Sequence, residues 1–361
     1  MLATDLDIFS TCPQSRDMEP NDGADYVRRV VEVAQWSERA GCRGMLIYTD
    51  NALIDPWFVA QVVIENTERL CPLVAVQPLY MHPYTVAKMV TSLGFIYRRR
   101  IYLNMVAGGF VNDLQALDDF TDHDERYRRL VEYTTIVSTL LQSEAPYSFA
   151  GDFYSVRKLA LRPSLSPDLL PPVFVSGSSP AGLAAARTLG ATAVRYPQPA
   201  MDEEMSSEPP ASGIGMRIGI YARPTAKEAW EGALARFPAD RKGQLTHAFA
   251  MRVSDSHWHH QLSTLGELEY SEEHPYWLGP FENYKTFCPY LVGSYSRVGE
   301  ELQRYVSLGF RTFVLDIPHE EEDLHHITAA FAAGLALDAG VPTVSDRALA
   351  PVHLTSDAAG A

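Results

Sequence analysis

The amino-acid sequence predicts an α/β fold, a (β/α)8 TIM barrel, and three observations lead to it. Short apolar segments of strand length alternate with amphipathic helical segments along almost the whole chain. Eight such strands are present, each followed by a helix or by an insertion. A chain of 361 residues, 46% of them hydrophobic, is long enough to form this barrel as one domain.

A doubly wound sheet is the alternative fold, and the first turn argues against it. Such a sheet more often carries a G-x-G-x-x-G turn after strand one, whereas this chain has Ser10-Thr-Cys-Pro13 there.

The predicted strands are short runs of mainly apolar residues. They are Leu6–Phe9, Gly44–Tyr48, Leu73–Gln77, Ile101–Val106, Val173–Ser176, Thr192–Tyr196, Met216–Ala222 and Thr312–Leu315.

The predicted helices follow from the helical spacing of apolar residues and from capping residues. In Tyr26–Ala40 the valines share one face, and Gly41 suits the C-terminal cap. Asp55 and Pro56 suit the start of the second helix. The remaining helices are expected at Tyr84–Tyr97, Arg126–Gln142, Ala181–Leu189, Thr225–Phe237 and Arg297–Leu308.

Three segments interrupt this alternation. Phe149–Tyr154 predicts a small hairpin on the connection between strands four and five. Pro197–Ser212 predicts a loop or disordered segment in place of a crossover helix. Residues 239–292 are expected to be an insertion between strands seven and eight, folded over the barrel mouth as a lid. The single domain then spans residues 1–342, and 343–361 form a C-terminal tail.

The composition excludes several classes of partner. A net charge of −15 leaves no basic excess to displace counterions from a nucleic acid. No apolar run approaches the roughly 20 residues that span a bilayer, and no signal peptide is recognisable. The four cysteines lack paired spacing, and His257–His260 has only Asp255 as a nearby acid, so no metal site is predicted. We expect a soluble, cytoplasmic protein.

The segment after strand five joins a strand end to a helix start. Gly177, Ser178 and Ser179 are small, and Pro180 fits the first position of the helix. The free N–H groups of a helix N-terminus favour a phosphate, but serine is also an ordinary N-cap. Both interpretations remain open on this segment alone.

Ligands of such barrels bind at the C-terminal ends of the strands. Asn104 interrupts an apolar strand there, and it predicts either a ligand contact or an amide satisfied by its neighbours. His123 and Tyr127 lie four residues apart and share one face of a long helix. The other polar residues expected to converge at these ends include Asp50, Asn51, Gln77, Ser176, Arg217 and His319.

Three motifs, in order and at these spacings, resemble the bacterial luciferase-like flavin-dependent monooxygenases, most closely the alkanesulfonate monooxygenase group. They are Asn104-Met-Val-Ala-Gly-Gly109, His123-Asp-Glu-Arg-Tyr127 and Val175-Ser-Gly-Ser-Ser179. The resemblance implies a barrel that binds reduced FMN (FMNH2) supplied by a separate NAD(P)H-dependent flavin reductase. It also implies the use of O2 to oxygenate a small-molecule substrate. We further expect a homo-dimer or homo-tetramer.

The resemblance also assigns site residues by position. Ser178, Ser179 and Tyr127 would hold the FMN phosphate, and Asn104 would contact the isoalloxazine edge. The full set of cofactor contacts is Gln77, Asn104, His123, Tyr127, Ser176, Gly177, Ser178 and Ser179.

The chain departs from the sulfonate enzymes at three positions. Leu53, Gly219 and Ile317 stand where those enzymes carry a cysteine, a histidine and a tyrosine. Groups that would recognise a sulfonate are therefore missing. We expect instead a larger organic substrate from a biosynthetic pathway, oxygenated by hydroxylation or by a Baeyer–Villiger reaction.

The catalytic candidates are His319 and Arg217 first, as substrate anchor or proton donor, and then Asp50 and Asn51. The stretch Pro280–Tyr295 is expected to be a hinged loop that covers the flavin. Two other functions stay open: an oxidoreductase using the deazaflavin F420, which shares this barrel, and a catalytically degenerate flavin-binding partner protein.

Overall fold

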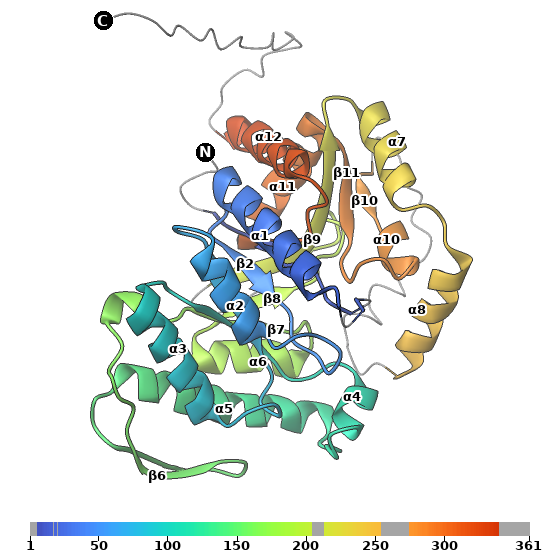
Figure 1. Cartoon of the computed structure of the whole chain (residues 1–361). Coiled ribbons are helices and arrows are strands. Elements are labelled where there is room, and N and C mark those ends of the chain that lie inside the picture. Colours follow the sequence, from blue (N-terminus) through green and yellow to red (C-terminus); the bar gives the residue numbers. More distant parts are fainter. Residues whose placement is uncertain (1–5, 17, 20, 204–212, 254–273, 339–361) are drawn as a thin grey trace, which may run out of the picture.

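The eight predicted strands form a closed parallel barrel in the computed structural model of the chain (Figure 1), which confirms the (β/α)8 prediction. The structure describes residues 6–16, 18–19, 21–203, 213–253 and 274–338. Each barrel strand pairs with the next, and the last strand, β12, closes the barrel by pairing with the first, β1. The barrel strands are β1 (Asp7–Thr11), β2 (Gly44–Ile47), β3 (Cys71–Val76), β4 (Tyr102–Val106), β7 (Val173–Ser176), β8 (Thr192–Arg195), β9 (Ile214–Arg223) and β12 (Phe310–Leu315).

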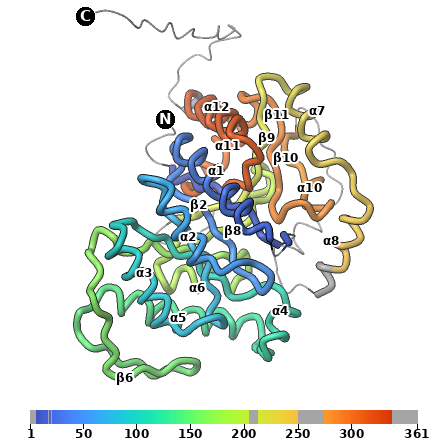
Figure 2. Tube along the Cα trace, viewed as in Figure 1, coloured from blue at the N-terminus to red at the C-terminus, as the bar shows by residue number. Residues whose placement is uncertain are grey.

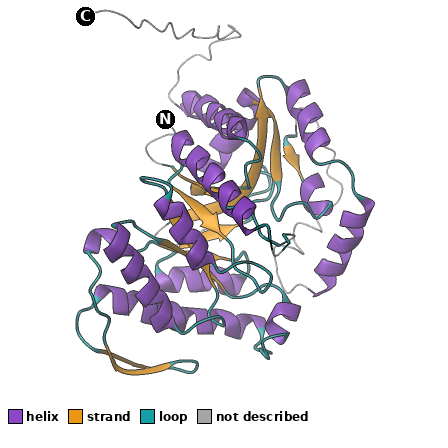
Figure 3. Ribbon diagram, in the orientation of Figure 1, coloured by secondary structure: helices purple, strands orange, loops and turns teal. Residues whose placement is uncertain are grey.

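Helices surround this barrel on the outside (Figure 3). Those that follow the first five barrel strands are α1 (Gly23–Ala40), α2 (Pro56–Glu65), α3 (Pro83–Tyr97), α4 (Val111–Gln115), α5 (His123–Gln142) and α6 (Pro180–Leu189). The later ones are α7 (Ala226–Arg236), α8 (Arg241–Val253), α10 (Gly279–Glu282), α11 (Tyr295–Ser307) and α12 (Glu321–Asp338). Figure 2 shows α1 and α12, the first and last helices, side by side where the barrel closes.

The predicted hairpin lies between α5 and β7. Strands β5 (Tyr147–Ala150) and β6 (Ser155–Leu159) pair antiparallel and project away from the barrel (Figure 1). A short 3-10 helix at Pro167–Leu169 then leads into β7.

The insertion between β9 and β12 adds two strands to the sheet beside β9. Strand β11 (Tyr290–Ser294) pairs in parallel with β9, and β10 (Tyr276–Trp277) pairs antiparallel with β11. The expectation of a hinged loop over Pro280–Tyr295 is therefore wrong for its second half, because Tyr290–Ser294 is a mostly buried strand hydrogen-bonded into a sheet.

The expected loop after β8 is confirmed for residues 197–203, which form turns without a helix. The rest of that segment, the His257–His260 tract and the tail 343–361 lie outside the described residues. Among the described helices, none has the length and apolar character needed to cross a bilayer.

A layer of large apolar side chains fills the barrel interior. Strand side chains alternate with a period of two, so one residue per strand points inward at each level. The rings of Phe9, Tyr102 and Phe174 meet edge to face, with centroids 5.2, 5.4 and 5.8 Å apart. Four aliphatic residues complete this layer: Leu46, Leu73, Val194 and Val314. The barrel is therefore plugged at this level.

The aromatic layer leads to a stability prediction. Phe9 is fully buried, so Phe9→Ala should lower the free energy of unfolding by about 3–5 kcal/mol through lost burial and a residual cavity. Phe58→Ala is the matched control, because Phe58 is 70% exposed on α2 and should change stability by less than about 0.5 kcal/mol. Urea denaturation measures both, and equal losses would contradict the assigned packing.

Candidate active site

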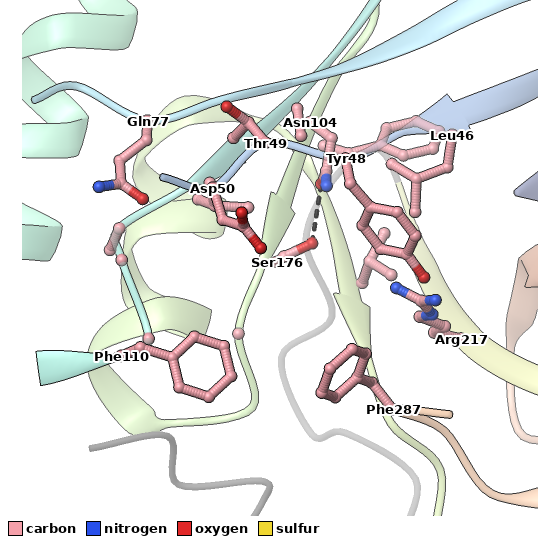
Figure 4. Close-up of a pocket in the computed structure, with 18 of the residues that line it drawn as sticks. Leu46, Tyr48, Thr49, Asp50, Gln77, Asn104, Phe110, Ser176, Arg217 and Phe287 are labelled. Carbon is pink, nitrogen blue, oxygen red and sulfur yellow. Dashed lines mark hydrogen bonds between the residues drawn. The ribbon is translucent and has the colours of Figure 1, made fainter. Parts of the chain in front are cut away.

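A cavity of about 220 Å³ lies on top of the aromatic layer, at the C-terminal ends of the strands (Figure 4). Its floor is formed by Leu46, Leu73, Phe174, Val194 and Val314. The side chains two residues further along the strands form its wall, because they point inward again. Among them are Tyr48, Ala75, Asn104, Ser176 and Tyr196.

This cavity brings together most of the residues that the sequence singled out. They are Asp50, Gln77, Asn104, His123, Tyr127, Ser176, Gly177, Ser178, Ser179 and Arg217. Asn51 lines a neighbouring cavity instead, where its amide accepts a hydrogen bond from the Tyr80 hydroxyl at 2.8 Å.

His319 does not reach either cavity. It lies beyond the end of β12 on the outer rim, where its ring packs edge-on against Phe237 with centroids 6.1 Å apart. Its backbone N–H donates to Asp323 Oδ2 at 3.1 Å, which anchors the start of α12. The geometry therefore gives no support to the predicted catalytic role of His319.

At one end of the cavity, the segment after β7 has features of an ordinary helix cap and also of a ligand site. Ser179 is the N-cap of α6 and accepts from the Gly182 N–H at 3.1 Å. The Ser178 hydroxyl oxygen is buried and has no hydrogen-bond partner within the described residues. A buried, unsatisfied hydroxyl costs about 1–3 kcal/mol, so this site favours a ligand that supplies the missing partner.

Tyr127 packs tightly against this segment from α5. A Cβ atom at Gly177 would lie 2.2 Å from the Tyr127 hydroxyl oxygen, so only glycine fits there. Burial raises the pKa of Tyr127, and a hydrogen bond with Ser179 offsets part of that rise. The phenol therefore remains a neutral donor at physiological pH. The His123 ring lies 5.2 Å from the Tyr127 ring and lines the same end of the cavity.

Asn104 lies at the centre of the cavity wall and is 6% exposed. Its side-chain oxygen accepts a hydrogen bond from the Ser176 hydroxyl at 2.8 Å, drawn as a dashed line in Figure 4. No partner for its amide nitrogen lies in the described part of the chain. One half of the amide is thus satisfied by a neighbour, and the other half is available to a ligand.

Arg217 forms the opposite side of the cavity. It is 6% exposed, and its guanidinium stacks on the Tyr48 ring at 4.6 Å (Figure 4). Its Nη2 lies 3.6 Å from Asp316 Oδ1, but Nε and Nη2 make no hydrogen bond with described residues. A buried guanidinium with free N–H groups suits an anionic or carbonyl oxygen.

Asp316 connects the segment after α10 to the side of the cavity that Arg217 forms. Its Oδ2 accepts hydrogen bonds from Thr286 Oγ1 at 2.6 Å and from the Tyr290 hydroxyl at 2.7 Å. The anchored segment carries Phe287, whose ring lies 6.5 Å from that of Phe110 at the edge of the cavity (Figure 4).

The polar rim near β2 holds a compact charge cluster. Asp50 pairs with Arg16 and accepts from the Ala52 N–H at 2.7 Å. Burial, and then the nearby Asp50 charge, raise the pKa of Asp113. Within the described ranges, no group of three His, Cys, Asp or Glu side chains could hold a metal ion.

Sequence reasoning missed several lining residues. Alternation from Leu46 could have identified Tyr48, because both point inward from β2 and its end. Arg16 and Phe110 gave no such signal, since they lie on connections whose course depends on tertiary packing.

Removing the Asp316 carboxylate should be costly. Asp316→Ala leaves two hydroxyls without their acceptor and a buried guanidinium without its counter-ion, so we expect a loss of about 3 kcal/mol or more. Asp25→Ala, on the exposed side of α1, is the control and should cost less than about 1 kcal/mol. Chemical denaturation measures the free energy of unfolding of both variants. A loss in Asp316→Ala as small as that in the control would show that Asp316 does not stabilise the Arg217 side of the cavity.

Comparisons with known proteins identify relatives of this chain. The model of the luciferase-like monooxygenase family matches residues 6–312. The 4-(gamma-L-glutamylamino)butanoyl-[BtrI acyl-carrier protein] monooxygenase BtrO of Niallia circulans is 34% identical over 314 residues, which cover 85% of this chain and 92% of that protein.

Two solved structures show the same fold. Riboflavin lyase RcaE, crystallised with modified FMN and riboflavin, has a TM-score of 0.71 at 15% identity and covers 93% of this chain and 92% of its own. An F420-dependent secondary alcohol dehydrogenase, in complex with an F420-acetone adduct, has a TM-score of 0.63 at 16% identity. The match covers 91% of this chain and 99% of that structure's chain.

Proposed function

The chain belongs to the luciferase-like monooxygenase family, and from this premise we propose that it is the oxygenase of a two-component system. In this proposal a separate NAD(P)H-dependent reductase supplies reduced FMN, and O2 is the oxidant. The observation that carries the proposal is the unpartnered Ser178 hydroxyl beside Tyr127, at the N-terminus of α6. Hydroxyl donors and free backbone N–H groups together suit a phosphate monoester.

The residues of the cavity fit FMN from one end to the other. Ser178, Tyr127 and the first N–H groups of α6 would bind the phosphate, with His123 beside the phosphate or the ribityl chain. The free amide nitrogen of Asn104 would donate to the edge of the flavin ring. Bound reduced FMN would supply the two electrons that let one atom of O2 enter the substrate while the other leaves as water.

The chain's own residues would protect and orient this reaction. The aromatic layer closes the cavity from below, and Phe110 and Phe287 shield its rim, so that bulk water is kept from the flavin. Arg217 would anchor an oxygen of the substrate through its free N–H groups. Asp50 lies at the rim, where it would act only with its Arg16 partner.

For the substrate class we propose an organic intermediate of a biosynthetic pathway. The BtrO relative acts on an acyl group bound to a carrier protein, which supports this choice at 34% identity. For the reaction we propose a hydroxylation or a Baeyer–Villiger oxidation. We also propose a cytoplasmic homo-oligomer.

The test of this function compares two cofactors and two oxidants. Purified protein is titrated with reduced FMN and with reduced F420 under anaerobic conditions. It is then supplied with ¹⁸O2 and acyl substrates, beginning with 4-(gamma-L-glutamylamino)butanoyl carrier protein. We expect selective binding of reduced FMN and one ¹⁸O atom in the product. Anaerobic oxidation of an alcohol with oxidised F420 as the hydride acceptor would instead establish a dehydrogenase. FMN binding without any oxygenation would indicate a degenerate partner protein.

A single substitution tests the phosphate site. Because the Ser178 hydroxyl makes no bond in the ligand-free protein, Ser178→Ala should leave stability nearly unchanged. It should weaken FMN roughly tenfold or more, since a hydrogen bond to a charged group contributes about 1.5–3 kcal/mol, and leave riboflavin binding unchanged. Fluorescence titration with both ligands measures this difference. Equal losses for the two ligands would place the phosphate elsewhere.

A further inference from the structure

A second cavity of about 450 Å³ adjoins the first one, between the connections that follow β2 and β3. The two share a wall made of Thr49, Asp50, Leu53, Ala75 and Gln77. Its volume falls within the range of about 300–1,000 Å³ that is usual for small-molecule sites. None of the roles assigned above to the flavin site uses this space.

Gln77 is the side chain in this wall that indicates a ligand. It is 93% buried, since its exposed fraction is 7%, and it lines both cavities. Its carboxamide makes no hydrogen bond within the part of the chain that the structure describes. In Figure 4 the carboxamide points away from Arg217 and Asn104. Because Gln77 lines both cavities, its amide is open to a hydrogen bond from a polar group in the second cavity.

The charges around the second cavity determine what that polar group is. Asp50 and Asp55 line it, and no Lys, Arg or His does so among the described residues. Asp50 is balanced by Arg16, whereas Asp55 is an exposed carboxylate with no basic partner among the described residues. Asp55 also caps α2 by accepting from the Trp57 N–H at 2.9 Å. Burial and then the charges of Asp113 and Asp50 raise the pKa of Tyr80, which lines the same space. The field in this cavity therefore favours a cation over an anion.

The remaining wall suits a carbon chain. Leu53, Trp57, Met81 and Leu117 present apolar surface between the polar groups. Such a wall buries methylene groups at about 25 cal/mol per Å².

We infer that the second cavity is a subsite for the amine-bearing end of the substrate, a primary ammonium on an aliphatic chain. Gln77 and Asp55 receive the ammonium, the apolar wall holds the chain, and the position to be oxidised stays in the first cavity beside Arg217. This inference deepens the proposed function and rests on it for the identity of the ligand as substrate.

The experiment uses n-hexylammonium as probe, with hexanol and hexanoate as matched controls of equal chain length. Binding is measured by calorimetry at pH 7 on FMN-saturated protein and on FMN-free protein. Hexylammonium should bind at least fivefold more tightly than hexanol, and hexanoate more weakly than either. Equal or tighter binding of hexanoate overturns the subsite.

Amino-acid substitutions test whether hexylammonium binds in the second cavity. Asp55→Asn removes the charge but retains a favoured N-cap residue, so it should abolish most of the preference for hexylammonium over hexanol. Asp25→Asn, exposed on α1, should leave the preference unchanged. Gln77→Leu, which keeps a similar volume, should weaken hexylammonium severalfold. An unchanged preference in both Asp55→Asn and Gln77→Leu overturns the inference.

The two proposals fail in different ways. Amine selectivity without any FMN binding would overturn the proposed function and leave the subsite standing. FMN binding without amine selectivity would overturn the subsite alone.

Discussion

The closure of the barrel, in which the last strand, β12, pairs with the first, β1, is the constraint on which the rest of this molecule depends. Once the sheet is a barrel, every second side chain of each strand must point into a confined interior. Phe9, Tyr102 and Phe174 fill one level of that interior, and the next level carries the polar groups of the site. The cavity is thus a consequence of strand register, since sliding one strand by a single residue would exchange its inward and outward side chains.

The insertion after β9 gives this barrel a wall of its own. Tyr290 on β11 lies opposite Gly219 on β9, and a Cβ atom at Gly219 would lie 2.2 Å from the Tyr290 ring. The space beside Gly219 is therefore filled by a tyrosine from another strand. That tyrosine donates a hydrogen bond to Asp316, which also pairs with Arg217, so the strand added by the insertion supports the Arg217 side of the cavity.

The sequence was informative where a local pattern determines the structure. Strand periodicity located all eight barrel strands, and Gly177 to Pro180 marked a helix N-terminus without any knowledge of the fold. Prediction failed where position depends on packing between distant segments. His319 follows a barrel strand but lies past the rim, and Tyr290 reads as part of a loop although it pairs with β9. The second cavity could not be predicted from the sequence either, because Gln77 and Asp55 line one cavity only when β2, β3 and α2 have assembled.

The unpartnered polar atoms of the site have a consequence for the lifetime of the protein. Ser178 Oγ and the Nε and Nη2 atoms of Arg217 are buried without hydrogen bonds among the described residues, so the empty fold is less stable than its packing alone would make it. A ligand that satisfies them stabilises the native state by mass action, by about 2.7 kcal/mol at a concentration one hundred times its dissociation constant. Under the proposed function this ligand is the flavin, so a shortage of flavin would let more chains unfold transiently and become available to proteases. Cellular abundance of the protein would then follow cofactor supply without requiring a separate regulatory site.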